Sequence, residues 1–362
     1  VKNARVDDKC YVYASIPATP GCEDSKVLGF ISHMDTVSDF ADHMVQPIVH
    51  ENYDGKDLPL GESGRTLEVA LFPHLPSLKG RTLITSDGTT ILGADDKAGV
   101  AAIMCMAERL MKDDMPHGKI CIGFTPDEEV GGGADHFDVK GFGADFAYTV
   151  DGGAESEIEY ENFNAVRADV DFKGFNIHPG SAKNTMINAA LVAMEFNNML
   201  PAGETPRDTD GYEGFYHLTR MSGNVEKANL NYILRDHDAD NIARRQEIMK
   251  EIAKKLNEKY GAGTVNLTLK EEYRNMAEKI RENFHLIENA KKAVKKSGVE
   301  PQVVPVRGGT DGARLSFMGL PCPNLGTGSY ACHGPYEHAT AEGMDIVVDT
   351  LTELVRLYGE MK

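Results

Sequence analysis

Residues 26–36 read KVLGFISHMDT, an apolar run that ends at the polar side chains of His33 and Asp35. Two later segments, KICIGFT (119–125) and DFAYTV (145–150), are also continuously apolar and are also followed by acidic residues. Strands of this kind are typical of a parallel sheet that helices cover on both faces. Residues 97–112 predict such a helix, because their apolar residues recur at the spacing of one helical face. These segments therefore predict an α/β sandwich.

The pattern changes at about residue 164, which indicates a second domain. A chain of 362 residues exceeds the size of one compact core. Strand-like and helix-like segments then follow in the order βαββαβ, over 165–174, 186–199, 215–223, 228–236, 242–260 and 264–273. This order is typical of a ferredoxin-like α+β domain. We expect an α/β domain made of residues 1–163 and 277–362, with residues 164–276 inserted into it.

The segment TLITSDGTTILGAD (82–95) makes a separate local prediction. Its Asp87-Gly88 step lies between two short strand-like runs. A turn signal in that position is typical of a β-hairpin. We therefore expect the two runs to pair with each other.

Charge and hydropathy argue against two classes of partner. The chain carries 56 acidic and 38 basic residues, a net charge of −18, whereas nucleic-acid binding needs clustered cations. No apolar stretch approaches the ~20 residues of a membrane helix, and no signal-peptide pattern precedes residue 11. The six cysteines form no C-x-x-C pair, as is typical of reduced thiols in the cytoplasm. Because the chain lacks an initial Met, we also expect that N-terminal sequence is missing.

Five residues in short motifs have side chains that suit metal binding. The motifs SHMDT, LGADDKAG, TPDEEVGGG, YTVDGG and YACHG contain His33, Asp95, Glu129, Asp151 and His333. Four of the motifs follow strand-like runs, and sites in open α/β sheets form at the carboxyl ends of strands. Two imidazoles and three carboxylates suit zinc or manganese. Three carboxylates would leave one divalent ion with an excess of negative charge, so the set favours two ions that share a hydroxide.

Neighbouring acids predict the remaining roles at such a centre. Asp35 lies two residues after His33, so both side chains can point to one side of a strand, and Asp35 can accept the second imidazole N–H. Glu128 and Glu129 are adjacent, so we expect one to bind metal and the other to be the general base for water. Asp96 is expected at a helix N-terminus rather than as a ligand.

These motifs resemble the dinuclear zinc aminopeptidase and carboxypeptidase family, and within it most closely the cytosolic aminotripeptidases. The similarity continues through LITSDGTTILGADDKAG (83–99), FTPDEEVGGGADHFDV (124–139), HPGSAKNTMINA (178–189) and RGGTDGARLSFMGLPCPNLGTG (307–328). It spans essentially the whole chain, apart from the N-terminal helices of the family. The chain departs from the family pattern in CHGPYEHATAEGM (332–344), at Tyr336, His338 and Ala341, which bears on the side-chain preference for the substrate.

The resemblance implies how the metal ions are bound. One zinc ion would be held by His33 and Asp151, the other by Glu129 and His333, with Asp95 as the bridge. It also implies a cis peptide bond between Asp95 and Asp96. The cofactors would be two Zn²⁺ per chain, with Mn²⁺ or Co²⁺ as substitutes.

The resemblance also implies the catalytic and substrate-binding residues. Asp35 would be the catalytic aspartate and Glu128 the general base. The inserted domain would be a lid that carries a homodimer contact. On this lid, His178 would stabilise the oxyanion and Arg235 would bind the substrate carboxylate, while Arg307 would line the substrate site.

Each of these side chains also has a simpler structural interpretation. His178 could cap the turn before Pro179, and Arg235 could pair with Asp236 or Asp238. For Arg307 a structural role and a substrate role are equally supported.

Three further features could be mistaken for binding sites. His338 lies five positions after His333, and Cys332 is the residue directly before His333. We expect neither His338 nor Cys332 to bind metal. The glycines at 131–133 are not followed by Lys-Ser or Lys-Thr, so a phosphate-binding loop is not expected there.

The predicted function is a cytoplasmic metallo-aminopeptidase. It would hydrolyse the N-terminal peptide bond of tripeptides through a metal-bridging hydroxide, with Glu128 as general base, and its substrates would be short peptides with a free N-terminus. A dipeptidase or an N-acyl-amino-acid deacylase with the same site stays open. So does a non-catalytic peptide-binding or oligomerising relative, against which the presence of Glu128 and of the full ligand set argues.

Overall fold

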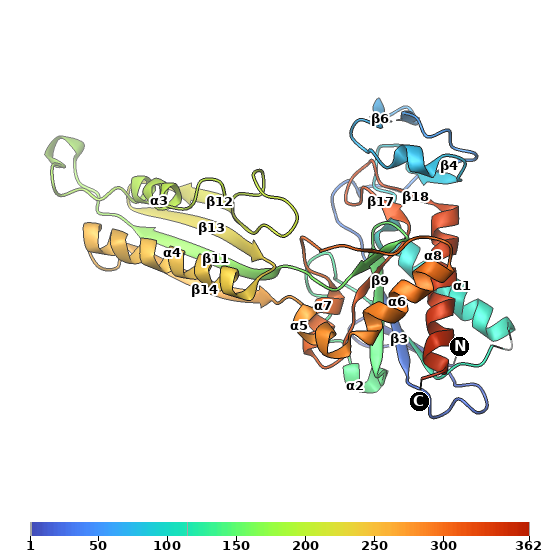
Figure 1. Ribbon diagram of the computed structural model, residues 1–362. Helices are drawn as coiled ribbons and strands as arrows, with labels where there is room; N and C mark the ends of the chain where they lie inside the picture. Colours follow the sequence, from blue (N-terminus) through green and yellow to red (C-terminus); the bar gives the residue numbers. More distant parts are fainter. Residues whose placement is uncertain (1, 114, 362) are drawn as a thin grey trace. The chain divides into compact units, whose positions relative to one another are not determined.

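The computed structural model describes residues 2–113 and 115–361, which form two compact units (Figure 1). Unit 1 comprises Val1–Tyr160, Met276–Val304 and Thr310–Lys362. Unit 2 comprises Glu161–Asn275 and Pro305–Gly309. The short return of residues 305–309 to unit 2 was not predicted from the sequence. The predicted division into a domain of residues 1–163 and 277–362 and an inserted domain of residues 164–276 stays a prediction.

Unit 1 is built on a mixed sheet whose described strands lie in the order β1-β2-β8-β3-β9-β16-β10-β15. The strands are Lys2–Val6 (β1), Val12–Ile16 (β2), Leu28–His33 (β3), Ile120–Thr125 (β8), Phe146–Gly152 (β9), Glu157–Glu159 (β10), Gln302–Val303 (β15) and Asn324–Gly326 (β16). The central strand β3 pairs in parallel with β8 and β9, and both β3 and β8 are buried along their whole length. This arrangement confirms the parallel core that the three apolar runs predicted.

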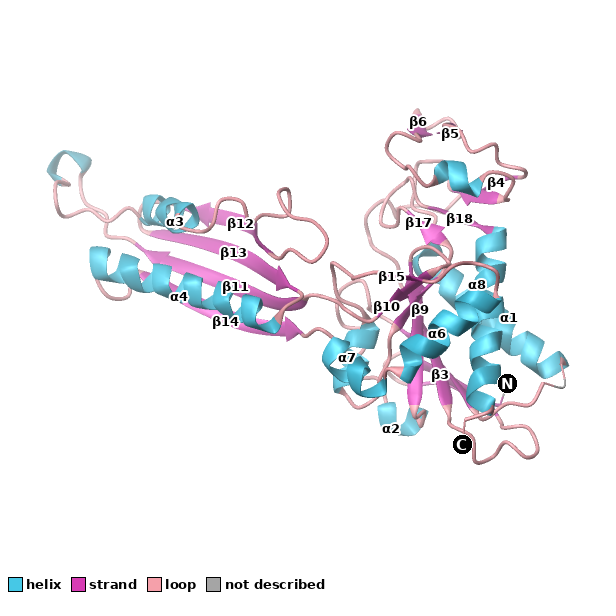
Figure 2. Cartoon of the chain, in the orientation of Figure 1, coloured by secondary structure: helices cyan, strands magenta, loops and turns pink. Residues whose placement is uncertain are grey.

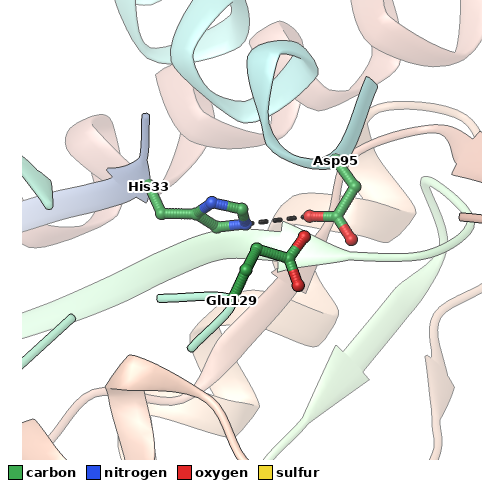
Figure 3. A group of neighbouring side chains, drawn as sticks. All are labelled: His33, Asp95 and Glu129. Atoms are coloured by element: carbon green, nitrogen blue, oxygen red, sulfur yellow. Dashed lines mark hydrogen bonds and ion pairs between the residues drawn. The ribbon is translucent and has the colours of Figure 1, made fainter. Parts of the chain in front are cut away.

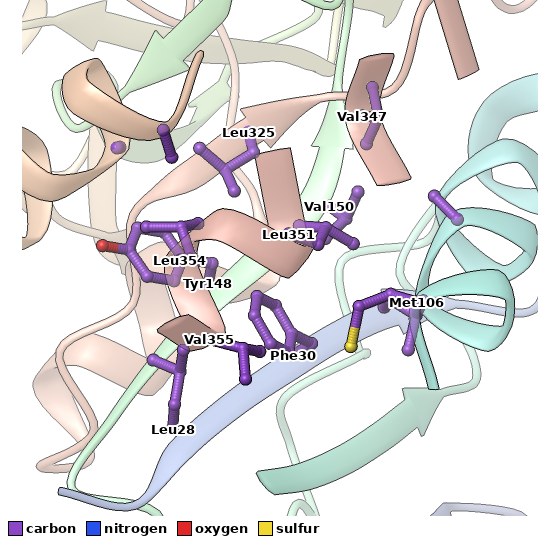
Figure 4. Packing of buried hydrophobic residues seen from close by; sticks show 14 of the residues in the cluster. Leu28, Phe30, Met106, Tyr148, Val150, Leu325, Val347, Leu351, Leu354 and Val355 are labelled. Carbon is purple, nitrogen blue, oxygen red and sulfur yellow. The ribbon is translucent and has the colours of Figure 1, made fainter. Parts of the chain in front are cut away.

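Helices cover both faces of this sheet, and the apolar side chains of β3 point alternately toward the two faces. Leu28 and Phe30 pack in the cluster that faces the three long helices (Figure 4), whereas Ile31 packs in the cluster on the opposite face. The long helices are Ala94–Lys112 (α1), His285–Lys296 (α6) and Ala341–Gly359 (α8). The other face is covered by Val139–Phe142 (α2) and Asp311–Phe317 (α7), and short helices at Leu75–Leu78 (η1), Ala277–Ile280 (α5) and Arg281–Asn283 (η3) complete the unit. Each large apolar side chain buried in this way stabilises the fold by roughly 1.5–3 kcal/mol.

A smaller sheet of unit 1 corrects the hairpin prediction. Its described strands lie in the order β17-β18-β7-β4, with bounds Ser329–Tyr330 (β17), His338–Thr340 (β18), Leu83–Thr85 (β7) and Ile48–His50 (β4). β7 pairs with β18 and β4, and residues 90–92 form no strand. The Asp87-Gly88 turn does form, since Asp87 accepts a hydrogen bond from the N–H of Thr89, but it leads into α1 instead of a second strand. The prediction was wrong because two distant segments already occupy both edges of β7. A separate pair of strands, Leu58–Leu60 (β5) and Arg65–Leu67 (β6), lies nearby in the sequence.

Unit 2 is an antiparallel sheet in the order β12-β13-β11-β14 with two helices packed on one face (Figure 2). Its elements are Asn164–Lys173 (β11), Pro179–Ser181 (η2), Ala189–Asn198 (α3), Phe215–Gly223 (β12), Lys227–Asp236 (β13), Ala239–Tyr260 (α4) and Val265–Tyr273 (β14). Residues of β13 alternate between buried and less buried positions, as a strand covered on one face must. The order of elements confirms the predicted βαββαβ pattern. α4 begins three residues earlier than predicted, because the Asp238 side chain caps it by accepting the N–H of Asn241.

Among the helices of the described chain, none combines the length and the apolar character that crossing a membrane requires.

Candidate functional site

The five predicted metal ligands all lie in unit 1, close to the ends of its elements. His33 is the last residue of β3 and Asp151 lies near the end of β9. Asp95 lies at the start of α1, Glu129 follows β8, and His333 lies between β17 and β18. α1 can approach β9 closely because Gly99 has no side chain, since a Cβ there would lie 1.9 Å from the carbonyl oxygen of Val150. This packing brings the N-terminus of α1 to the edge of the sheet where His33 and Asp151 lie.

The two oxygens of Asp95 face two different imidazoles. Oδ1 lies 2.8 Å from Nε2 of His33 (Figure 3), and Oδ2 lies 2.9 Å from Nε2 of His333. Asp151 Oδ1 lies 3.2 Å from Nε2 of His33, and Glu129 Oε2 lies 3.2 Å from Nε2 of His333. The five side chains therefore form two half-sites that share the Asp95 carboxylate. The His33 half-site contains His33 and Asp151, and the His333 half-site contains His333 and Glu129.

Glu128 lies beside the His33 half-site. Ligand atoms of His33, Asp95 and Glu129 all lie within 4.8 Å of one another, and the same holds for His33, Glu128 and Asp151. Oε1 of Glu129 is buried and has no hydrogen-bond partner within the described residues. A buried carboxylate that has one oxygen without a donor and the other beside an imidazole nitrogen is suited to a divalent cation. The residues therefore fit a metal ion in each half-site.

The electrostatics of the cluster reflect the crowding of its acids. Burial, followed by the charge of Asp151, raises the pKa of Glu128 to about 9. Burial also raises the pKa of Asp151 to about 7. Hydrogen bonds to Asp95 and Glu129 raise the pKa of His333 to about 10. All three shifts favour the protonated form of the group concerned.

The backbone carbonyl of Asp35 determines which nitrogen of His33 faces the half-site. Nδ1 of His33 lies 3.0 Å from this carbonyl oxygen, which can only accept a hydrogen bond. Nδ1 therefore carries a proton, and in the neutral imidazole Nε2 is free to bind a cation. The carboxylate of Asp35, which was expected in this role, lies farther away, at 3.4 Å.

The Asp35 carboxylate instead holds the backbone of the two adjacent glutamates. Oδ1 accepts the N–H of Glu128 and Oδ2 accepts the N–H of Glu129, each at 3.1 Å. One side chain thus sets the position of both glutamates relative to β3. Sequence spacing carried no signal for this contact, because the donors are backbone groups.

Asp96 supports the same region from inside α1. The peptide bond between Asp95 and Asp96 is cis. The Asp96 carboxylate is buried and accepts the N–H of His33 and the N–H of Gly99, each at 3.1 Å. Both oxygens of Asp96 are therefore used by backbone groups, as expected for a residue that is not a ligand.

Several supporting residues were not singled out from the sequence. Asn324 accepts the N–H of Asp151 through Oδ1 and donates from Nδ2 to Glu159. Glu337 accepts the N–H groups of Gly93 and Asp95. These contacts join positions far apart in the chain, so local sequence patterns could not reveal them.

His338 and Cys332 are placed as expected for residues that do not bind the metal ions. His338 is fully buried; its Nε2 lies 2.8 Å from Nε2 of His74 and its Nδ1 lies 2.8 Å from the carbonyl oxygen of Tyr336. The Sγ atom of Cys332 lies 3.7 Å from the hydroxyl of Ser329.

His178 lies in unit 2, where it is exposed on the turn that begins at Pro179. Its Nδ1 accepts the N–H of Gly180 at 3.1 Å, so it does cap this turn. Because Nδ1 is an acceptor, the proton of the neutral imidazole is on Nε2, which can donate to an external oxygen.

Arg235 and Arg307 also lie in unit 2 and have different environments. Arg235 donates to Glu272 at 3.2 Å and lies over the ring of Tyr273, so it pairs with neither Asp236 nor Asp238. Arg307 donates to the carbonyl oxygens of Gly211 and Glu213 and lies over the ring of Phe163. These contacts give Arg307 a structural role in holding the loop that contains residues 209–213.

Comparison with known proteins places these features in a wider group. The family model described as peptidase family M20/M25/M40 matches residues 87–357. Peptidase T of Clostridium perfringens strain ATCC 13124 is 54% identical over 362 residues, which are 99% of this chain and 88% of that protein. Peptidase T of Halothermothrix orenii is 50% identical over 362 residues, with the same coverage.

Two solved structures have the same fold. The aminopeptidase PepT of Bacillus cereus superposes with a TM-score of 0.79 at 23% identity, over 99% of this chain and 89% of that one. A tripeptidase of Staphylococcus aureus superposes with a TM-score of 0.79 at 21% identity and the same coverage.

Proposed function

This chain belongs to peptidase family M20/M25/M40, and we propose that it is a metal-dependent aminotripeptidase that releases the N-terminal residue of tripeptides. The observation that carries the proposal is the position of Asp95, whose two oxygens face His33 and His333. The proposal draws further support from the relatives named peptidase T, which match almost the entire chain.

We propose that the centre holds two metal ions per chain, zinc in the first instance, with manganese or cobalt as substitutes. His33 and Asp151 would hold one ion, Glu129 and His333 the other, and Asp95 would bridge them. When bound, two divalent cations lower the pKa of an attacking water, polarise the scissile carbonyl and favour the ionised form of Glu128.

The chain's own residues would carry the proton transfers. Glu128 would accept a proton from the attacking water and pass it to the departing amine. Asp35 would keep this carboxylate in place, because it holds the N–H groups of Glu128 and Glu129. The two adjacent glutamates would thus have different roles. Glu129 would bind a metal ion, and Glu128 would accept the proton of the water.

Two residues of unit 2 complete the proposal. His178 would donate from Nε2 to the oxyanion, a role that its hydrogen bond from Gly180 supports by fixing the proton on that nitrogen. Arg235 would bind the C-terminal carboxylate of the tripeptide. We assign Arg307 to the support of its loop rather than to direct substrate contact.

We further propose that residues 164–276 form an inserted lid domain that carries a homodimer contact, with residues 1–163 and 277–362 as the catalytic domain. We also propose a cytoplasmic location, which the six free cysteines support. Light scattering of the purified chain tests the dimer, and loss of the dimer on a charged substitution in the exposed part of β12 would locate it.

The decisive experiment compares hydrolysis of an unblocked tripeptide, its N-acetylated form and a dipeptide by the purified protein. We expect the unblocked tripeptide to be cleaved fastest, activity to vanish with a chelator and to return with zinc, and Glu128→Ala to be inactive. Glu108→Ala, on the exposed face of α1, is the matched control and should retain activity. Activity that survives complete metal removal would overturn the mechanism, and equal cleavage of the N-acetylated peptide would favour the deacylase alternative.

A further inference from the structure

Glu337 is a buried carboxylate that binds the backbone at the start of α1. Its side chain is in a residue only 1% exposed. Oε2 accepts the N–H of Gly93 at 2.6 Å, and Oε1 accepts the N–H of Asp95 at 2.9 Å. Gly93 is the N-cap residue of α1, so the negative charge lies where the helix dipole favours it. Glu337 therefore anchors the segment of backbone from which the bridging carboxylate extends.

Glu337 also belongs to the loop that carries His333. The N–H of Glu337 donates to the carbonyl oxygen of Gly334 at 3.1 Å, which closes a turn directly after His333. Nε2 of His333 lies 2.9 Å from Oδ2 of Asp95. Oε1 of Glu337 accepts the backbone N–H of the same aspartate, also at 2.9 Å. One loop therefore holds the same aspartate at two points.

The two half-sites differ in how firmly their histidines are anchored. His33 is 2% exposed, lies within β3 and has its N–H bound by Asp96. His333 lies outside the strands, its side chain is 54% exposed and its φ is 66°. The position of His333 therefore depends more on the contacts of its own loop.

From these contacts we propose that Glu337 is a positioning residue for the dinuclear centre. It fixes Asp95 between the two imidazoles, and its loss weakens metal binding at the His333 half-site more than at the His33 half-site. This inference rests on the proposed dinuclear centre. It assigns no direct contact between Glu337 and metal, because both carboxylate oxygens already accept backbone N–H groups.

Glu337→Gln tests the proposal at almost constant volume. The amide retains one acceptor oxygen but turns an NH₂ donor toward a backbone N–H, so one of the two hydrogen bonds is lost. Glu342→Gln is the matched control, because Glu342 also accepts a backbone N–H, that of Thr82 at 2.8 Å, and its carboxylate also accepts the Thr82 hydroxyl.

The measurement is calorimetric titration of the metal-free proteins with Co²⁺, together with the visible absorption of each bound ion. We expect the wild-type chain and Glu342→Gln to bind two ions with the same affinities. In Glu337→Gln the first ion should bind within about threefold of wild type, and the second about 10–100-fold more weakly. Saturating metal should then restore most of kcat.

The outcomes separate this inference from the proposed function. Equal weakening of both ions, or no weakening, would overturn the role of Glu337 while leaving a two-metal peptidase intact. A wild-type chain that binds fewer than two ions would defeat the proposed function itself. If Glu337→Gln fails to fold, Glu337→Asp replaces it, since it keeps the charge but shortens the reach; an unchanged second affinity in that variant would also overturn the role.

Discussion

Nε2 of His333 lies 2.9 Å from Oδ2 of Asp95, although 238 residues separate the two in the chain. The other oxygen of the same carboxylate lies 2.8 Å from Nε2 of His33. A carboxylate that offers each oxygen to a different imidazole is placed to bridge two cations. The bridge makes the two half-sites depend on each other, and the first prediction follows from that dependence.

Asp95→Asn should disrupt both half-sites, because the amide nitrogen cannot bind a cation and one bridging oxygen is lost. We expect bound metal to fall to one ion or fewer per chain and kcat/KM to fall by more than about 100-fold. Metal analysis after dialysis measures the first and a tripeptide assay the second. Asp345→Asn, an exposed position on α8, should behave as wild type. Full metal content in Asp95→Asn would refute the bridging role.

Glu128→Gln and Glu129→Gln should have different effects. Loss of the proton acceptor in Glu128→Gln should lower kcat by about 10²–10⁴-fold while two ions stay bound. Glu129→Gln should lower the affinity for one ion, because its Oε2 belongs to the His333 half-site. Single-turnover rates and metal content, measured on both variants, distinguish the roles. A lost ion in Glu128→Gln with an intact centre in Glu129→Gln would reverse the assignment.

Metal binding should release protons and become tighter as pH rises. The pKa of His333 is raised to about 10 by Asp95 and Glu129, so the metal-free imidazole is protonated at neutral pH. It must lose that proton before Nε2 can bind a cation, and protons on Glu128 and Asp151 are displaced in the same direction. Affinity should therefore rise between about pH 6 and pH 9. Calorimetry in two buffers of different ionisation enthalpy measures the release, and His217→Asn, an exposed position, should leave it unchanged. Affinity that is independent of pH would contradict this account.

His338 should make the protein sensitive to acid. Burial lowers its pKa from 6.5 to about 4, so the folded protein keeps it neutral while the unfolded chain protonates it at higher pH. The unfolded state binds more protons between these values, so the free energy of unfolding should fall as the pH drops from 6.5 to 4. The part due to His338 is at most about 3 kcal/mol. Denaturant unfolding at several pH values measures how steeply the free energy of unfolding changes with pH. This pH dependence should be weaker in His338→Gln, and an unchanged pH dependence would exclude His338 as the cause.

Arg307→Ala should destabilise unit 2 without changing substrate binding. The guanidinium donates to the carbonyl oxygens of Gly211 and Glu213, and each lost hydrogen bond to a charged group costs about 1.5–3 kcal/mol. We expect a lower Tm and an unchanged KM for the tripeptide at temperatures where the protein is folded. A large rise in KM at an unchanged Tm would instead restore the substrate role.

Much of the fold follows from local patterns that the sequence displays directly. The run that ends at His33 is buried throughout because both of its faces are apolar. Residues 228–236 were predicted as a strand, and β13 alternates between buried and less buried positions as a strand covered on one face must. Asp238 is a cap residue of the kind that local sequence can indicate, although α4 begins three residues before its predicted start at residue 242. These signals are local because each depends only on side chains a few residues apart.

The pairing of β7 shows where local patterns fail. The Asp87-Gly88 turn is encoded locally and it forms, but the partners of β7 come from residues 48–50 and 338–340. The choice between a hairpin and these partners depends on which segments pack against the edges of β7 in the folded chain. Backbone hydrogen bonds are nearly the same for any strand, so side-chain patterns do not identify the partner.

The sequence alone determined which side chains are available for metal chemistry, because histidine and carboxylate ligands can be recognised by type and by their place after apolar runs. Only the tertiary structure decided how those side chains are held. The Asp35 carboxylate accepts the N–H groups of Glu128 and Glu129, and the Glu337 carboxylate accepts the N–H of Asp95. Every residue but proline offers the same backbone N–H, so such contacts leave no trace in the sequence and arise only when distant segments pack together.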